Sequence, residues 1–148
     1  MSDHPLIGTW RLVSYELESA TGTISYPYGH DPSGYLIYAA DGYMSVAFMT
    51  GDRTPYAGGD RLRGTPEERA AAAGTYVSYC GRYELREDRV IHHIEVSLFP
   101  NWVGVAQTRY FTLAGTQLTL RTPPLLMGGS TQTARVLWER ATDIHPGA

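Results

Sequence analysis

The residues best suited to chemistry lie between positions 90 and 111, where two strand-like runs flank the connection Pro-Asn-Trp-Val-Gly. If the runs pair symmetrically about that connection, Glu95 faces Arg109 across an antiparallel ladder. His93 lies two positions before Glu95 and shares its face. This set suits proton transfer, with His93 as general acid or base, Glu95 orienting it, and Arg109 holding an enolate or carboxylate oxygen. We predict these three as the catalytic residues.

The same residues also fit a purely structural role. Charged side chains are mostly exposed, and Glu95 with Arg109 as a surface ion pair would contribute roughly 0 to 1 kcal/mol. His92 points to the opposite, more apolar face, which favours a packed structural histidine or a subunit contact. His93 and Glu95 lack a third ligand for a metal ion, so we predict no metal and no other cofactor.

The hairpin formed by residues 105–113 and 116–121 indicates which side of the sheet is buried. Its pairing puts Arg109 on the same face as Phe111 and Leu120. The opposite face consists of Thr, Tyr, Gln and Arg side chains, which are better suited to water. We therefore expect the side that carries Arg109 to be the interior.

Asp41-Gly42 is typical of a two-residue hairpin turn. Such a turn pairs Tyr35 with Phe48 on the apolar face and leaves Tyr38 on a mixed solvent face. Combined with the other hairpins, this register predicts which residues contact a ligand. They are Arg82, Gln107, Phe111, Leu118, Leu120, Tyr35, Phe48, Met44 and Trp102.

About eight strand-like segments follow one another as sequential hairpins along the chain. A single short helix interrupts them, since Thr65-Pro66 and two acidic residues form a strong helix start before an alanine run. We expect this helix to lie on the sheet as a lid or plug. The pattern predicts an all-β fold: an up-and-down antiparallel barrel that forms a single domain over residues 1–148 and holds one small ligand.

Length and composition exclude several classes of function. The chain has 148 residues and a formal charge of −3, with no basic run that would bind nucleic acid. All twelve cationic side chains are Arg, so Schiff-base catalysis by Lys is excluded, and the lone Cys80 cannot form an intramolecular disulfide. No apolar run reaches the ~20 residues of a membrane helix, and the first ten residues lack the pattern of a secretory signal. We expect a cytoplasmic protein with no membrane partner.

Several short motifs resemble those of a known family. Gly8-Thr9-Trp10 opens the first strand and Trp138-Glu139-Arg140 ends the last, as in lipocalins, where an Arg of the final strand covers a Trp at the barrel floor. Residues 92–97, 100–104 and 107–109 look like motifs of the small bacterial and fungal lipocalin-like domain family. That resemblance covers nearly the whole chain. It implies a central cavity for a small, largely apolar molecule, and some barrels of this general kind are cyclases or isomerases.

These observations predict that the barrel binds a small hydrophobic metabolite of aromatic or polyketide-like character, for which the eleven tyrosines supply amphipathic surface. The enzyme hypothesis is cyclisation or isomerisation by acid/base chemistry at His93, Glu95 and Arg109. The alternative hypothesis is a non-catalytic carrier or sensor of the same ligand class. A third hypothesis is an interaction protein that forms a homodimer through an apolar face of Ile94, Val96 and Leu98.

Overall fold

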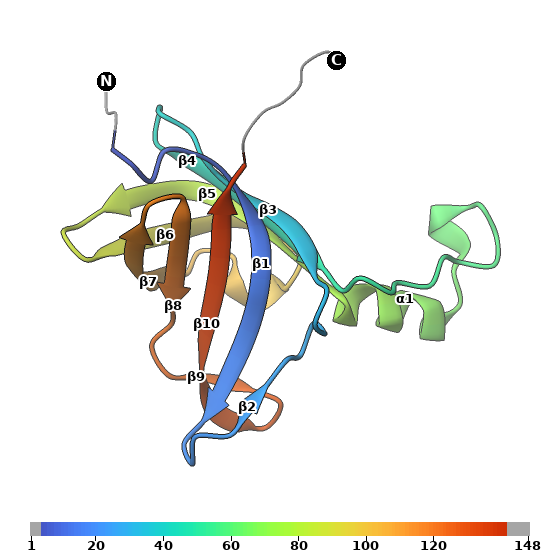
Figure 1. The fold of residues 1–148 in the computed structure, drawn as a ribbon. Coiled ribbons are helices and arrows are strands. Elements are labelled where there is room, and N and C mark those ends of the chain that lie inside the picture. Colours follow the sequence, from blue (N-terminus) through green and yellow to red (C-terminus); the bar gives the residue numbers. More distant parts are fainter. Residues whose placement is uncertain (1–3, 142–148) are drawn as a thin grey trace.

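The computed structural model describes residues 4–141, which form ten strands and three short helices (Figure 1). Long alternating segments give the strands, and turns rich in Gly, Pro and Asp separate them. The strands are β1 (Gly8–Ser19), β2 (Ile24–Ser25), β3 (Ser33–Tyr38), β4 (Tyr43–Met49), β5 (Tyr76–Leu85), β6 (Arg89–Ser97), β7 (Ala106–Ala114), β8 (Gln117–Arg121), β9 (Leu125–Met127) and β10 (Ser130–Arg140). The helices are η1 (Arg61–Arg63), α1 (Pro66–Gly74) and η2 (Pro100–Trp102).

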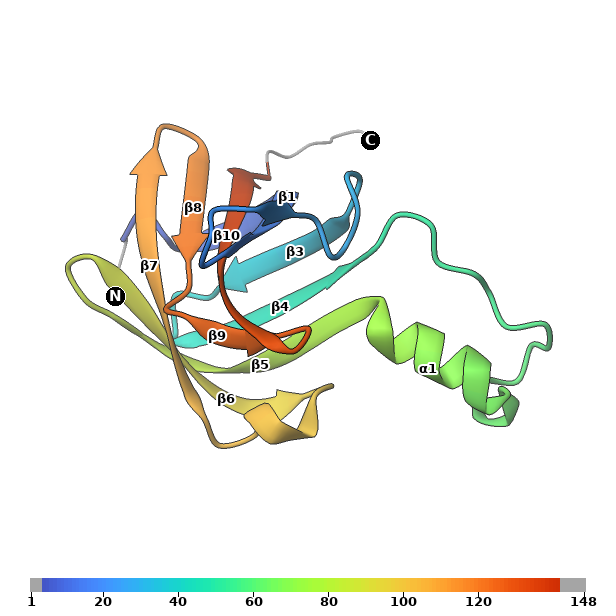
Figure 2. The same cartoon turned by 90° about the horizontal axis from the view of Figure 1, so that it is seen from below.

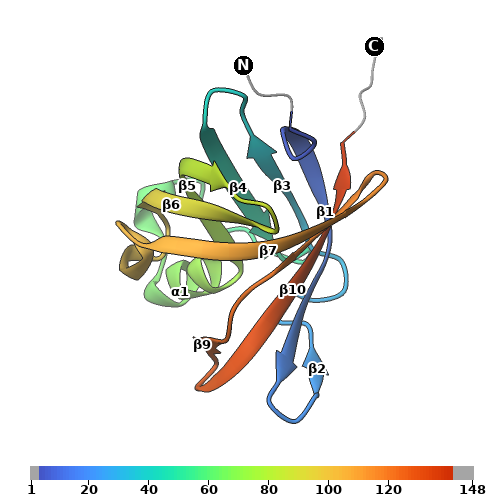
Figure 3. The same cartoon turned by 90° about the vertical axis from the view of Figure 1, so that its left-hand side faces the viewer.

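Eight strands close into a barrel. β1, β3, β4, β5, β6, β7, β8 and β10 follow one another around it, each antiparallel to the next. β10 also pairs with β1, and Figure 3 shows these two strands side by side. The short strands β2 and β9 pair with β1 and β10 at the margins. The predicted up-and-down antiparallel barrel of about eight strands with one short α-helix is therefore confirmed.

One end of the barrel is closed by Trp10. Its side chain is fully buried, and its indole Nε1 donates a hydrogen bond to the Leu6 carbonyl oxygen at 2.9 Å. The Arg140 guanidinium lies 4.1 Å from the centre of the indole ring and donates to the Ile7 carbonyl oxygen at 2.6 Å. A cation over an aromatic face with satisfied hydrogen bonds makes a firm floor. The Trp and Arg arrangement implied by the lipocalin resemblance is present.

The hairpin of β3 and β4 has a longer turn than predicted. The Ala39 amide donates to the Tyr43 carbonyl oxygen at 2.8 Å, which leaves a three-residue loop in which Gly42 has a φ of 97°. One extra loop residue moves the register by one position and exchanges the two faces of β3. Tyr38 is consequently buried inside the barrel, and Tyr35, predicted to contact ligand, is 51% exposed on the outside. The prediction for both side chains was wrong.

Helix α1 begins with the predicted signals but is neither a lid nor a plug. The Thr65 hydroxyl accepts from the Glu68 amide at 3.1 Å, and the Glu68 carboxylate accepts from the Thr65 amide at 2.9 Å. The helix contains no buried residue and extends away from the barrel (Figure 2). Only its last two residues, Ala73 and Gly74, line the barrel cavity. Within residues 4–141, no helix has the length and apolar character needed to cross a membrane.

Candidate functional site

The barrel encloses a cavity of about 890 Å³. Its lining includes all three residues of β9, and this strand lies at the end of the barrel away from the start of β1 (Figure 1). Exposed apolar residues of its lining, Leu98, Phe99 and Leu126, mark the open end. The wall is mainly aromatic and aliphatic, and it includes Tyr15, Tyr28, Phe48, Leu120, Val136 and Trp138. This size and character match sites for small, largely apolar molecules.

His92 lies at the centre of the polar groups inside the barrel. Its side chain is 1% exposed because β6 alternates and turns Val90, His92 and Ile94 inward. The Nε2 atom of His92 is 2.7 Å from the Tyr38 hydroxyl, and its Nδ1 atom is 2.7 Å from the Tyr79 hydroxyl. Both ring nitrogens are therefore engaged, and the two tyrosines fix the plane of the imidazole.

The imidazole of His92 is neutral at physiological pH. Burial is the main cause that holds its pKa well below the ordinary value, and the electrostatic effects of Arg109 and then His93 act in the same direction. A neutral imidazole has one N–H donor and one bare acceptor nitrogen. One tyrosine hydroxyl therefore donates to His92, and the other accepts from it. No ring nitrogen is left over to bind or deprotonate a ligand.

Arg109 is the charged residue of the cavity wall. It comes from β7, next to Gln107, and both side chains line the cavity. The Arg109 guanidinium donates to the Gln107 side-chain oxygen, and to the Thr108 carbonyl oxygen at 3.0 Å. It also lies beside the Tyr79 hydroxyl, whose pKa it lowers against the larger raising effect of burial. Among residues 4–141, no Asp or Glu lines the cavity or forms an ion pair with Arg109.

The pairing of β6 with β7 differs from the predicted one. Arg109 lies opposite Val90 rather than opposite Glu95, five positions further along β6. Because an odd displacement exchanges the faces of a strand, Arg109 and His92 share the interior while His93 points outward. The predicted arrangement of His93, Glu95 and Arg109 on one interior face was wrong. The prediction that Arg109 shares the inner face with Phe111 and Leu120 is confirmed by their pairing.

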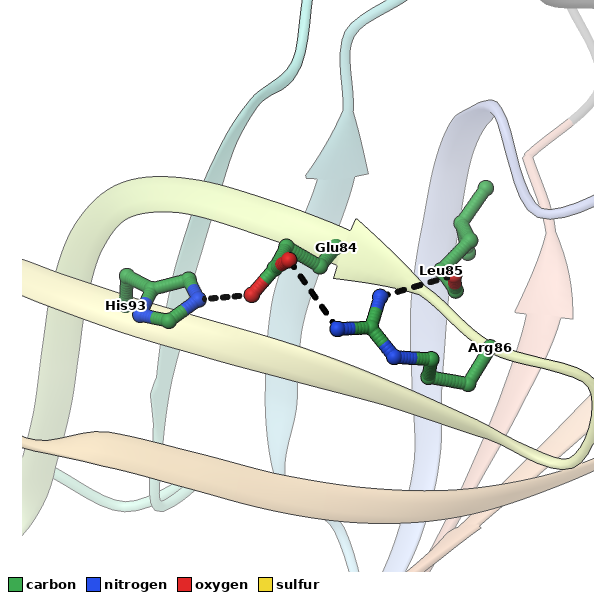
Figure 4. Close-up of polar contacts among 4 residues, drawn as sticks. All are labelled: Glu84, Leu85, Arg86 and His93. Carbon is green, nitrogen blue, oxygen red and sulfur yellow. Dashed lines mark hydrogen bonds and ion pairs between the residues drawn. The ribbon is translucent and has the colours of Figure 1, made fainter.

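His93 takes part in an exposed polar cluster on the outer face of β5 and β6 (Figure 4). Its Nε2 donates to a Glu84 carboxylate oxygen at 2.5 Å, and Arg86 donates to the other Glu84 oxygen at 3.1 Å. These hydrogen bonds, that of His93 first, lower the pKa of Glu84. Glu95 lies on the same outer surface, where it forms an ion pair with Arg82 at 3.6 Å. More than 40% of each of these five side chains is exposed.

A β-bulge at Glu95 explains why its neighbours do not alternate as predicted. Cys80 pairs with Val96, and the next residue, Gly81, pairs with Ile94, so Glu95 is the extra residue on β6. Gly81 is required there because a Cβ atom would lie 1.9 Å from the His93 carbonyl oxygen. Ile94 is buried and Val96 is 63% exposed. The predicted continuous apolar face of Ile94, Val96 and Leu98 is therefore absent.

The predicted ligand-contacting residues fall into three groups. Gln107, Phe48, Leu120 and Trp102 line the cavity. Met44 and Leu118 are buried in the core but do not line the cavity, and Phe111 is partly buried against that core. Tyr35 lies outside the barrel because of the longer β3–β4 loop, and Arg82 lies outside because it pairs with His93, which points outward.

The sequence interpretation missed the tyrosines that accompany Arg109 inside the barrel. Tyr15, Tyr38 and Tyr79 are all largely buried, and burial is the main cause that raises the pKa of each. They remain neutral hydroxyls at physiological pH. Their signal was the position of His92 on the apolar face of its strand, since a buried imidazole requires hydrogen-bonding partners from neighbouring strands.

Comparison with known proteins agrees with the barrel and its cavity. Residues 7–141 match the family described as the lipocalin-like domain. The chain belongs to the lipocalin-like domain family. The chain is also similar to an Aspergillus oryzae protein named 4'-hydroxy-3'-methoxypropiophenone carrier protein. The two sequences are 34% identical over 106 aligned positions, and the match covers 66% of this lipocalin-like chain and 96% of the relative.

Proposed function

We propose that this lipocalin-like barrel binds one small, largely apolar molecule and holds it without chemical change. The observation that carries the proposal is the open cavity of about 890 Å³, whose wall is mostly aromatic and aliphatic and includes one cation. Gln107, Arg109, Trp102, Phe48 and Leu120 are the proposed ligand contacts. The lipocalin-like fold and the relative named as a carrier both support binding of a small hydrophobic ligand.

Phenolic aryl ketones are the ligand class that we propose. The name of the Aspergillus oryzae relative specifies such a molecule, with an aromatic ring, a ketone and a phenolic hydroxyl. The wall of this cavity offers aromatic faces at Tyr15, Tyr28 and Phe48 for the ring. Gln107 and Arg109 offer hydrogen bonds for the oxygen atoms. Ring and polar groups of the ligand thus have matching partners within one cavity.

Binding without turnover is favoured over the predicted cyclisation or isomerisation. General acid/base catalysis needs a titrating group within hydrogen-bond reach of the substrate. His93 and Glu95 are on the outer surface, and His92 has both ring nitrogens engaged by tyrosines. A cytoplasmic location, a single domain over residues 1–148 and a homodimer stay predictions from the sequence.

Filling the cavity tests the proposal. Leu120 lines the cavity from β8, whereas Thr119 is its neighbour on the same strand and does not. We expect Leu120→Trp to weaken binding of 4'-hydroxy-3'-methoxypropiophenone at least tenfold in isothermal titration calorimetry, because the larger ring occupies the ligand's volume. Thr119→Trp is the matched control and keeps the affinity. Circular dichroism checks that both variants fold.

Two results would contradict the proposal. Equal affinity in folded Leu120→Trp and wild-type protein would place binding outside the cavity. Conversion of the ketone during incubation with wild-type protein, detected by liquid chromatography and mass spectrometry, would show that the protein is an enzyme and not a carrier. The expected result is complete recovery of the ligand unchanged.

A further inference from the structure

We propose that the cavity takes its ligand as an anion, with an ionised phenolic oxygen placed beside the guanidinium of Arg109. This inference rests on the proposed function and adds the charge state and orientation of the ligand. It starts from an imbalance in the cavity: the wall carries a cation and, among residues 4–141, no carboxylate.

The immediate partners of Arg109 do not neutralise it. The guanidinium donates to two uncharged acceptors, the Gln107 side chain and the Thr108 carbonyl oxygen. Arg stays protonated in proteins, so a partly buried guanidinium cannot lose its charge as a buried Lys or His does. A mobile counter-charge that enters through the open end would complete this site.

The other titratable groups that face the cavity do not supply that charge either. They are Tyr15 on β1, Tyr28 in the loop after β2, Tyr79 on β5 and His92 on β6. Tyr38 on β3 does not line the cavity, but its hydroxyl forms a hydrogen bond with His92. Burial raises the pKa of these tyrosines and lowers that of His92, so all are neutral. Tyr76 also lines the cavity.

A phenolic ketone differs from these tyrosines in two ways. A ketone conjugated with the phenol delocalises the negative charge and makes the hydroxyl much more acidic than that of tyrosine. The tyrosine hydroxyls are also fixed in the barrel wall, that of Tyr79 against His92, whereas a ligand in the open cavity loses less of its hydration. A hydrogen bond in which the donor or the acceptor is ionised is about twice as strong as one between neutral groups. Contact with Arg109 therefore outweighs the remaining desolvation of the phenolate.

The absorption spectrum of the bound ligand tests this directly, because a phenol conjugated with a ketone absorbs at longer wavelength when ionised. We would titrate 4'-hydroxy-3'-methoxypropiophenone with pH, free and with saturating wild-type protein. The expected result is a pKa about one unit lower for the bound ligand, which equals a tenfold preference for the anion. An unchanged or higher pKa of the bound ligand would overturn the inference, whatever any variant does.

Variants of two arginines locate the cause of the shift. Arg109→Gln removes the cavity charge and is expected to abolish the shift, and Arg109→Lys is expected to restore most of it. Arg82→Gln removes an arginine from the outer face, where it pairs with Glu95, and is expected to leave the shift intact. A full shift in folded Arg109→Gln would contradict the role of this guanidinium.

The methyl ether of the same ligand separates this inference from the proposed function, because it has no ionisable hydroxyl. If the cavity binds phenolic ketones as anions, raising the pH from 6 to 8 strengthens binding of the phenol and leaves that of the ether unchanged. If both molecules bind with the same pH dependence, the claim that the ligand binds as an anion is wrong, but the proposed function stands. Failure of both to bind wild-type protein would overturn the proposed function and this inference together.

Discussion

Two neighbouring histidines of β6 lie in opposite environments. His92 is inside the barrel, between the hydroxyls of Tyr38 and Tyr79, and is 1% exposed. His93 is on the outer surface, where it donates to Glu84 beside Arg86 (Figure 4). The inner histidine is neutral and holds hydroxyl groups in place, whereas the outer one belongs to a solvated network of charges. Residue type alone therefore does not identify the functional face; the direction of the side chain does.

The largest expected difference between the two histidines is in stability. His92→Ala removes a buried ring and leaves two tyrosine hydroxyls without their partner, so we expect a loss of about 3 to 5 kcal/mol in the free energy of unfolding. His93→Ala removes an exposed contact and is expected to leave the unfolding midpoint nearly unchanged. Urea denaturation followed by circular dichroism measures both. Similar losses in the two variants would contradict the assignment of inner and outer faces.

The pH dependence of stability sharpens the same comparison. Burial holds the pKa of His92 below that of an unfolded histidine, about 6.5, so below this pH the unfolded chain takes up a proton that the folded chain does not. The free energy of unfolding should therefore fall by about 1.4 kcal/mol per pH unit as the pH decreases below 6.5. Above pH 6.5 this contribution is constant. The measurement is urea denaturation between pH 7.5 and 5.5.

Substitutions at the two histidines assign that slope. His92→Gln removes the titrating group and is expected to flatten the curve by the amount attributed to His92. His93→Ala keeps it. A slope that survived in His92→Gln and disappeared in His93→Ala would show that the outer histidine is the one that resists protonation.

The smallest effect is expected on the outer surface. The ion pair between Arg82 and Glu95 spans 3.6 Å, and both side chains are more than half exposed. Such pairs contribute roughly 0 to 1 kcal/mol, so Glu95→Gln should change stability by less than about 1 kcal/mol and leave ligand affinity unaltered. Isothermal titration calorimetry compares the ligand affinity of Glu95→Gln with that of Leu120→Trp. A tenfold loss of affinity in Glu95→Gln would return Glu95 to the binding site.

Much of the fold could be predicted from local patterns. Alternating runs, turn residues and the Thr65-Pro66 helix start depend on neighbouring positions, and they gave the strand order and the helix start. The position of Arg109 inside the barrel also followed, because the polar outer face of the β7 and β8 hairpin settles which side is buried. The turn of that hairpin has only two residues and its strands pair without a bulge, so the faces of the two strands can be matched from the sequence.

Side-chain direction could not be predicted where irregular backbone intervenes. The three-residue loop before Tyr43 turned Tyr38 into the barrel and Tyr35 out of it. The η2 connection displaced the pairing of Arg109 along β6 by an odd number of residues. The bulge at Glu95 then broke the alternation of β6. Each event changes the register by an odd number of positions, and an odd change is enough to move a strand's side chains from core to solvent. The buried tyrosines around His92 depended on those registers and were missed with them.

The most direct test of the account is a crystal structure of the protein with 4'-hydroxy-3'-methoxypropiophenone. The account predicts the aromatic ring inside the barrel cavity, with its phenolic oxygen within hydrogen-bond distance of the Arg109 guanidinium. A ligand seated on the outer face near Arg82 and His93, with the cavity free of it, would contradict the central claim that the interior of this barrel is the functional site.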